Sequence, residues 1–140
     1  NPSLFPLTEC DATDDILIVQ IDPVFRDTVP KTPETILDRL NEISFNSPLL
    51  VELRGLHLVN TLMLRGHLDP MVCGLRKLHI HMIGDEAAMS GLPLESKFNP
   101  EWSFLLSLHE AGKAATKKWL ETYFEDIGKK STLDIAALVS

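Results

Sequence analysis

Two histidines stand two residues apart in a short apolar run, and their type and spacing suit chemistry. His79 and His81 flank Ile80 in the segment KLHIHMI. Residues two apart in a strand lie on the same face, so both imidazoles could bind one metal ion. Asp85 or Glu86 could supply a third ligand. The alternative is a pair of hydrogen-bonded histidines on the polar face of a strand, and we adopt it over the metal site.

Asp22, His109 and the two cysteines are further candidates for a functional role. Asp22 follows a predicted strand, where α/β folds place ligand-binding groups, but the proline after it favours a turn. His109 falls on a predicted helix and is interpreted as a surface or boundary residue. Cys10 and Cys73 are too few for a disulfide framework, form no C-x-x-C pair and are interpreted as packing or surface thiols.

The sequence holds no complete catalytic motif. A serine hydrolase elbow needs Gly-x-Ser-x-Gly, and no serine here has glycine at both flanking offsets. Ser90 and Gly91 come closest. A Walker loop, a dinucleotide fingerprint and an H-E-x-x-H helix are absent as well. We therefore expect no catalytic residue and no cofactor site among these residues.

Length and composition favour a single globular domain and argue against a nucleic-acid-binding or membrane-spanning protein. With 140 residues and 44% hydrophobic residues, one domain with a real core is expected. The net charge of -7 argues against binding to nucleic acid, which needs a basic face. No apolar run reaches the roughly 18 residues of a membrane span. The low cysteine count favours a reducing compartment, so a cytoplasmic location is expected, with peripheral attachment to membranes left open.

The segment DDILIVQID (residues 14–22) organises the fold. Ile16 to Val19 form an unbroken apolar run that ends before Asp22 and a proline, which is typical of a strand buried on both faces of a parallel sheet. Such a strand needs neighbours, yet only residues 77–83 form a second good strand. A long crossover between the two strands favours parallel pairing. The chain therefore resembles the end of a larger α/β domain.

Three helices are predicted. The first begins at Pro33, after a Thr32 cap, and carries an apolar stripe at helical spacing. Residues 46–48 (Asn-Ser-Pro) predict a break after this helix. A second helix, which is apolar nearly all round, is predicted from about Pro48 to Arg65. The third follows Asn99-Pro100-Glu101 and ends near Gly128.

The remaining segments are predicted to be less regular. Residues 1–14 are expected to be a loop in which Leu4–Leu7 pack on something. Residues 67–75 are expected to be a linker, and Glu86–Met89 a short helical turn. No fixed structure is predicted for the tail Ser131–Ser140.

Several blocks resemble the C-terminal part of bacterial patatin-like phospholipases, in the subgroup with a helical C-terminal extension. These blocks are NPSLFPL, ILIVQIDPV, TPETILDRLNEISFNSPLLVELR, LHIHMI and the run from SKFNPEW to STLDI. They cover roughly residues 1–135. NEISFNS and the DIG-x-x-ST-x-DI ending are the most specific of them.

The resemblance implies an α/β/α sandwich and a lipid acyl hydrolase that uses a Ser–Asp dyad and no metal. In such proteins an Asp-Gly-Gly motif comes just before an Asn-Pro segment like Asn1-Pro2. The nucleophile, the aspartate and the oxyanion loop would all lie upstream of this chain, and no family catalytic residue falls on a position here. The implied partners are that upstream segment and a lipid or acyl-ester substrate.

The prediction is thus an α/β chain with two parallel strands and predominant helices. Residues 1–30 would end the patatin-like catalytic core, and residues 31–140 would form a mainly helical extension with one further strand. The function expected is that of the non-catalytic portion of an esterase or phospholipase. The alternative is a helical interaction or dimerisation module, and a homo-oligomer is left open in both cases.

Overall fold

In the computed structural model, residues 3–9, 12–92 and 94–139 are described. The predictions for Asn1-Pro2 and for Cys10 lie outside these ranges. The chain divides into two compact units that interleave along the sequence. The first unit comprises residues 1–18, 47–82 and 125–140, and the second comprises residues 19–46 and 83–124.

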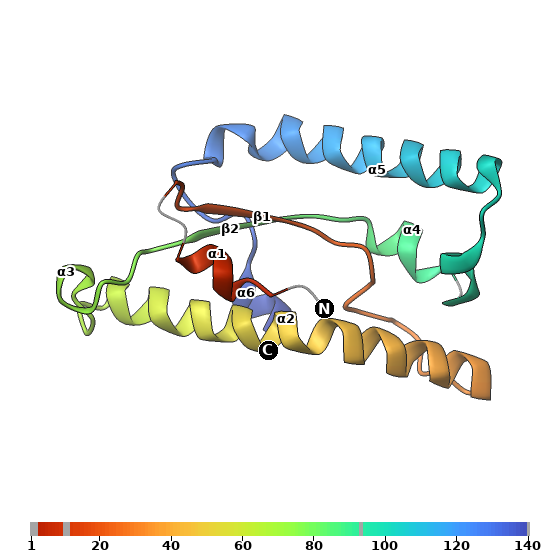
Figure 1. The fold of residues 1–140 in the computed structure, drawn as a ribbon, viewed down its shortest axis with the longest axis horizontal. Coiled ribbons are helices and arrows are strands. Elements are labelled where there is room, and N and C mark those ends of the chain that lie inside the picture. The colour runs from red at the N-terminus through yellow and green to blue at the C-terminus, as the bar shows by residue number, and fades with distance from the viewer. Residues whose placement is uncertain (1–2, 10–11, 93, 140) are drawn as a thin grey trace. The chain divides into compact units, whose positions relative to one another are not determined.

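Helices predominate over strands, as Figure 1 shows. The elements in chain order are α1 (Phe5–Thr8), β1 (Asp15–Val19), α2 (Pro33–Leu64), α3 (Pro70–Cys73), β2 (His79–Ile83), α4 (Glu86–Ser90), the 3-10 turn η1 (Leu94–Phe98), α5 (Trp102–Tyr123), the 3-10 turn η2 (Phe124–Asp126) and α6 (Ile135–Val139). This mixture of helices with two parallel strands confirms the predicted α/β class.

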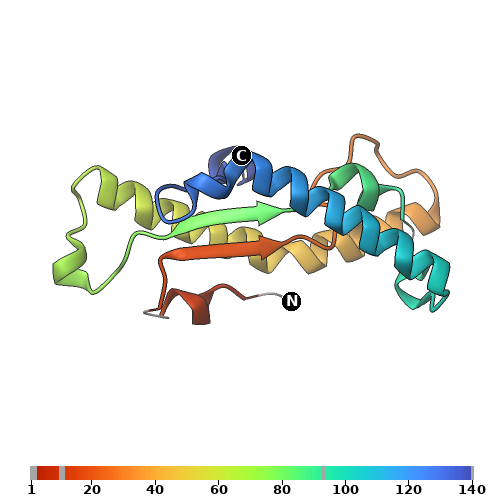
Figure 2. The same cartoon turned by 90° about the horizontal axis from the view of Figure 1, so that it is seen from above.

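The two strands pair with each other and run in the same direction (Figure 2). The His79 amide donates to the Asp14 carbonyl at 2.8 Å, and the Gln20 amide donates to the Ile83 carbonyl at 2.8 Å. Both partners advance together along the chain, which is the parallel register. Parallel pairing was predicted from the long crossover and is confirmed.

β1 is buried on one face and bare on the other. Ile16 and Ile18 belong to the core, whereas Leu17 is 49% exposed and Val19 is 67% exposed. The expectation of burial on both faces is therefore not met within this chain. Alternate residues of a strand point to opposite faces, and only one face of β1 is covered by packed side chains.

The core of the first unit is built from the strands, the C-terminal half of α2 and α6. Leu53 and Ile80 are 0% exposed at its centre. The other buried members are Leu4, Ile16, Ile18, Leu49, Leu78 and Ile135. Leu4 bears out the prediction that the N-terminal apolar segment packs, although Phe5 and Leu7 beside it are exposed.

The predicted break at residues 46–48 is wrong. α2 runs without interruption from Pro33 to Leu64 and contains Pro48 in its interior. A proline there removes one helical hydrogen bond and crowds the preceding turn. Leu49 and Leu53 are buried just after it, and we attribute the continuity of the helix to this packing.

The C-terminal tail is also more ordered than predicted. The amides of Thr132 and Leu133 donate to the Ile80 carbonyl at 3.1 and 3.0 Å, and the Ile80 amide donates to the Ser131 hydroxyl at 3.1 Å. Ile135 then enters the core from α6. These bonds satisfy the backbone of Ile80 on the side of β2 away from β1, a long-range pairing that local sequence patterns do not reveal.

The other helices agree more closely with prediction. α4 confirms the helical turn at Glu86–Met89, and the Asp85 carboxylate caps it by accepting from the Ala88 amide at 3.0 Å. α5 follows the Asn-Pro-Glu start, where the Asn99 side chain accepts from the Glu101 amide at 3.0 Å. Within the predicted linker, α3 forms one additional short helix.

Candidate functional site

His79 and His81 lie on the same side of β2, as predicted, and both approach one carboxylate. Asp15 Oδ1 lies 2.9 Å from His81 Nε2 and 3.5 Å from His79 Nδ1. The Gly128 amide donates to the same oxygen at 2.8 Å. Among the described residues, no three His, Cys, Asp or Glu side chains are placed to hold a metal ion.

His81 also joins the C-terminal segment to this network. Its Nδ1 lies 2.9 Å from the Thr132 hydroxyl, so hydroxyl, imidazole and carboxylate stand in series. A series of this kind can activate a hydroxyl for nucleophilic attack. Here His81 is only 1% exposed, so a substrate would not reach its ring. The network is therefore best read as a structural link between β1, β2 and residues 128–132.

Electrostatics favour the ionised form of Asp15. Burial raises its pKa, but the hydrogen bonds from His81 and the Gly128 amide and the charges of His79 and His81 outweigh burial. The net effect lowers the pKa of Asp15 below its ordinary value of 3.8. The carboxylate is thus held as an acceptor for the His81 ring and the Gly128 amide, while His79 acts on it through its charge alone.

Glu52, on α2, holds the N-terminal segment of the first unit. Its Oε2 accepts from the amides of Leu4 and Phe5, the latter at 3.1 Å, and its Oε1 accepts from the Ser3 hydroxyl at 2.9 Å. α1 has no side-chain cap from its own N-cap residue. A carboxylate from a distant helix therefore supplies the acceptor that local capping would provide.

In the second unit, the NEISFNS block of α2 carries buried polar residues that hold the loop after β1. Glu42 pairs with Arg26 of that loop, and with Arg39 at 3.1 Å. Asn46 donates to the Pro23 carbonyl at 3.0 Å. Burial raises the pKa of Glu42, but the hydrogen bonds from Arg26 and Arg39 prevail and lower it. These contacts anchor the loop that follows β1 to α2.

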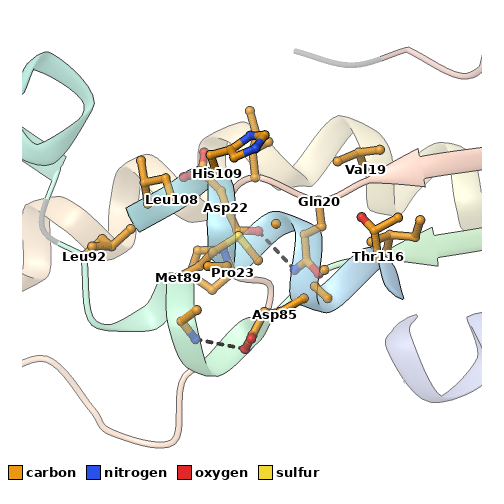
Figure 3. Close-up of a pocket in the computed structure, with 18 of the residues that line it drawn as sticks. Val19, Gln20, Asp22, Pro23, Asp85, Met89, Leu92, Leu108, His109 and Thr116 are labelled. Carbon is orange, nitrogen blue, oxygen red and sulfur yellow. Dashed lines mark hydrogen bonds between the residues drawn. The ribbon is translucent and has the colours of Figure 1, made fainter. Parts of the chain in front are cut away.

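A cavity of about 1010 Å³ lies within the second unit (Figure 3). It is bordered by the ends of both strands, the N-terminal half of α2, α4 and the middle of α5. Much of its lining is apolar. Its apolar members include Val19, Ile21, Ile83, Met89, Leu92, Leu108 and Leu120.

Polar groups gather near the strand ends of this cavity. Asp22 is 5% exposed and its carboxylate pairs with the Lys97 ammonium at 3.0 Å. Gln20 donates to the Asp22 carbonyl at 3.1 Å and to the Glu86 carboxylate at 2.7 Å. Asp22 is therefore more than the turn former we predicted, because its charge is buried, paired and part of the cavity wall.

Gly84 allows the Gln20 side chain to take this position. A Cβ added at Gly84 would lie 2.9 Å from Gln20 Cβ, closer than such atoms approach. The glycine after β2 is thus required by a neighbouring side chain and not by a turn.

The remaining candidate residues are exposed. His109 lies on α5 at the cavity (Figure 3), with a side chain that is 63% exposed, in agreement with a surface or boundary position. Cys73 is an exposed thiol at the end of α3. Within the described residues, no helix is both long and apolar enough to cross a membrane.

Comparison with family models, with curated proteins and with solved structures found no match.

Proposed function

We propose that this chain is the C-terminal, non-catalytic part of a patatin-like lipid acyl hydrolase. The Ser–Asp dyad would come from the segment upstream. The observation that carries the proposal is β1: its neighbour β2 lies on one side, and Leu17 and Val19 present an apolar face to solvent. Parallel sheets are normally covered on both faces, and two strands alone seldom suffice.

The buried polar contacts of α2 support the same proposal. Glu42 and Asn46 belong to the most specific block of the resemblance, and both hold the loop that leaves β1. In the parent enzyme these contacts would fix the last core strand against the helical extension. The apolar cavity would offer a surface of matching character to an acyl chain of the substrate.

A specific observation favours the alternative of an interaction module. The N-terminal half of α2 carries an apolar stripe that stays largely exposed. Its members are Ile36, Leu37, Leu40 and Ile43, each 44–56% exposed. Apolar stripes of this kind mark surfaces that associate with a partner or a second copy.

The test compares this chain with the longer protein that carries the upstream segment. A fluorophosphonate probe should label one serine of the longer protein, which should hydrolyse a p-nitrophenyl acyl ester. This chain alone should show neither reaction. Turnover by the chain alone, or no labelling of the longer protein, would refute the proposal. A concentration-dependent dimer without esterase activity would favour the interaction module.

A further inference from the structure

We infer that the turn between α2 and β2 (residues 64–77) docks onto a membrane surface that carries anionic lipids. Figure 1 shows α3 at the outer end of this turn, beyond the last residues of α2. The whole turn belongs to the first unit. The inference uses only residues of that unit, and it holds whether or not the chain comes from a hydrolase.

The turn exposes its apolar side chains to solvent. On α3, Met71 is 93% exposed and Val72 is 84% exposed, and Leu64 is exposed where α2 ends. Among the large hydrophobic residues that the structure describes, Met71 is the most exposed. Apolar side chains that protrude together from a surface mark a site of contact with a partner or a membrane.

The backbone of α3 is already hydrogen-bonded within the turn. The Met71 amide donates to the Asp69 carboxylate at 2.9 Å, and the next two amides donate to the Asp69 carbonyl, both at 3.1 Å. The Gly74 amide donates to the Pro70 carbonyl at 3.0 Å, and a proline has no amide hydrogen. Every backbone N–H from residue 70 to residue 74 is therefore paired, so the turn can approach hydrocarbon without exposing an unpaired donor to it.

This part of the chain is positively charged, whereas the rest is negative. Residues 53–84 contain three arginines and one lysine but only one aspartate, a net charge of +3 in a chain of net charge -7. Arg76 is held by Asp14 at 3.1 Å. Arg65 and Lys77 are exposed, and neither forms an ion pair with another residue of the described part of the chain. A bilayer with anionic head groups offers apolar and negative contacts together, which matches this turn.

The test measures binding of this chain to sucrose-loaded vesicles by co-sedimentation. Vesicles of phosphatidylcholine and phosphatidylserine should bind it at least about tenfold more tightly than vesicles of phosphatidylcholine alone. The double variant Met71→Ser, Val72→Ser should lower the affinity for the mixed vesicles at least about tenfold, because it removes the apolar contacts. The double variant Arg65→Gln, Lys77→Gln should lower it about 20-fold, because it removes two cations near the lipid surface.

Matched control variants carry the same changes at other exposed positions. Val29→Ser removes an apolar side chain that is 79% exposed in the loop after β1. The double variant Lys117→Gln, Lys118→Gln changes the net charge by the same amount on α5. Both controls should bind the mixed vesicles as tightly as wild type. Losses in the controls equal to those in the turn variants would overturn the inference, as would wild-type binding that does not depend on phosphatidylserine.

A fluorescent label locates the contact on the protein. An environment-sensitive fluorophore on Cys73, which is an exposed thiol next to Val72, is introduced in a Cys10→Ser background. Its emission should shift to shorter wavelength when mixed vesicles are added. Unchanged emission from vesicle-bound protein would overturn the inference. Self-association that Met71→Ser, Val72→Ser abolishes, without any binding to vesicles, would also overturn it and would assign the turn to a second copy of the chain.

Discussion

At the scale of single residues, the buried network around Asp15 carries the clearest dependence on pH. Because the fold lowers the pKa of Asp15, the unfolded chain binds a proton first as the pH falls. The stabilisation of the fold by ionised Asp15 is therefore complete above the ordinary pKa of 3.8. It is lost as the pH falls through the lower pKa that Asp15 has in the folded protein.

Asp15→Asn should lower the free energy of unfolding at pH 7 by about 1–3 kcal/mol, because His81 and the Gly128 amide lose a charged acceptor. Urea denaturation at pH 7 and below pH 4 measures this. The difference in the free energy of unfolding between wild type and Asp15→Asn should be smaller in acid than at pH 7. Asp27→Asn, at an exposed position, is the control. A gap that stays constant with pH would contradict the assignment.

A second residue-scale prediction concerns Gly84. Gly84→Ala should destabilise the protein by about 1–3 kcal/mol, because the added methyl group meets Gln20 Cβ. Displacing Gln20 also breaks its bond to Glu86. Thermal unfolding checks the change, and a variant as stable as wild type would show that Gln20 can move without cost.

The sequence predicted these residues unevenly. That His79 and His81 share a face followed from the period of a strand. Their partner Asp15, and the Thr132 hydroxyl on His81, could not be predicted, because 66 and 51 residues separate them from His81. Glu52 was hidden for the same reason, since its partners lie 47 to 49 residues away.

At the scale of elements, α2 retains a proline that local rules would exclude. Pro48→Ala should raise the free energy of unfolding by about 1–2 kcal/mol, because it restores a helical donor and relieves crowding with the preceding turn. Pro33→Ala, at the first helical position, should have little effect. The melting temperatures of both variants test this prediction. If Pro48→Ala does not raise the melting temperature, the helix already accommodates the proline ring.

A glycine in α5 should respond to alanine in the opposite way to Gly84, with a gain in stability. A Cβ at Gly112 meets nothing within 4 Å, so Gly112→Ala should stabilise the helix by about 1 kcal/mol. The same thermal measurement compares the two variants directly. Destabilisation by Gly112→Ala would indicate that this part of α5 is not helical in solution.

Element prediction succeeded where the signal was local. The starts of α2 and α5 and the turn at α4 were marked by proline and capping residues, and β1 and β2 by apolar runs. The break in α2 and the irregular tail were wrong because tertiary packing decided both. Leu49 and Leu53 hold the helix together past its proline, and the backbone of Ile80 orders the tail.

At the scale of the whole molecule, the exposed face of β1 is the feature that should differ between this chain and its proposed longer parent. Val19→Lys should leave the stability of this chain within about 0.5 kcal/mol, because Val19 is 67% exposed. In the longer protein the same change should cost more than about 2 kcal/mol, because a layer packed over this face of the proposed sheet would bury the lysine. Urea denaturation of both proteins tests this, and equal effects would argue against a further layer over this face of β1.

The interleaving of the two units has a consequence for biosynthesis. The first unit needs residues 125–140 to complete its contacts with β2, although its first strand is made more than a hundred residues earlier. Nascent chains from which residues 125–140 have not yet emerged would therefore hold Ile16, Ile18 and Ile80 in an unfinished core. Folding of this unit is expected to wait until residues 125–140 have emerged, and chaperones would be needed most in the interval before that.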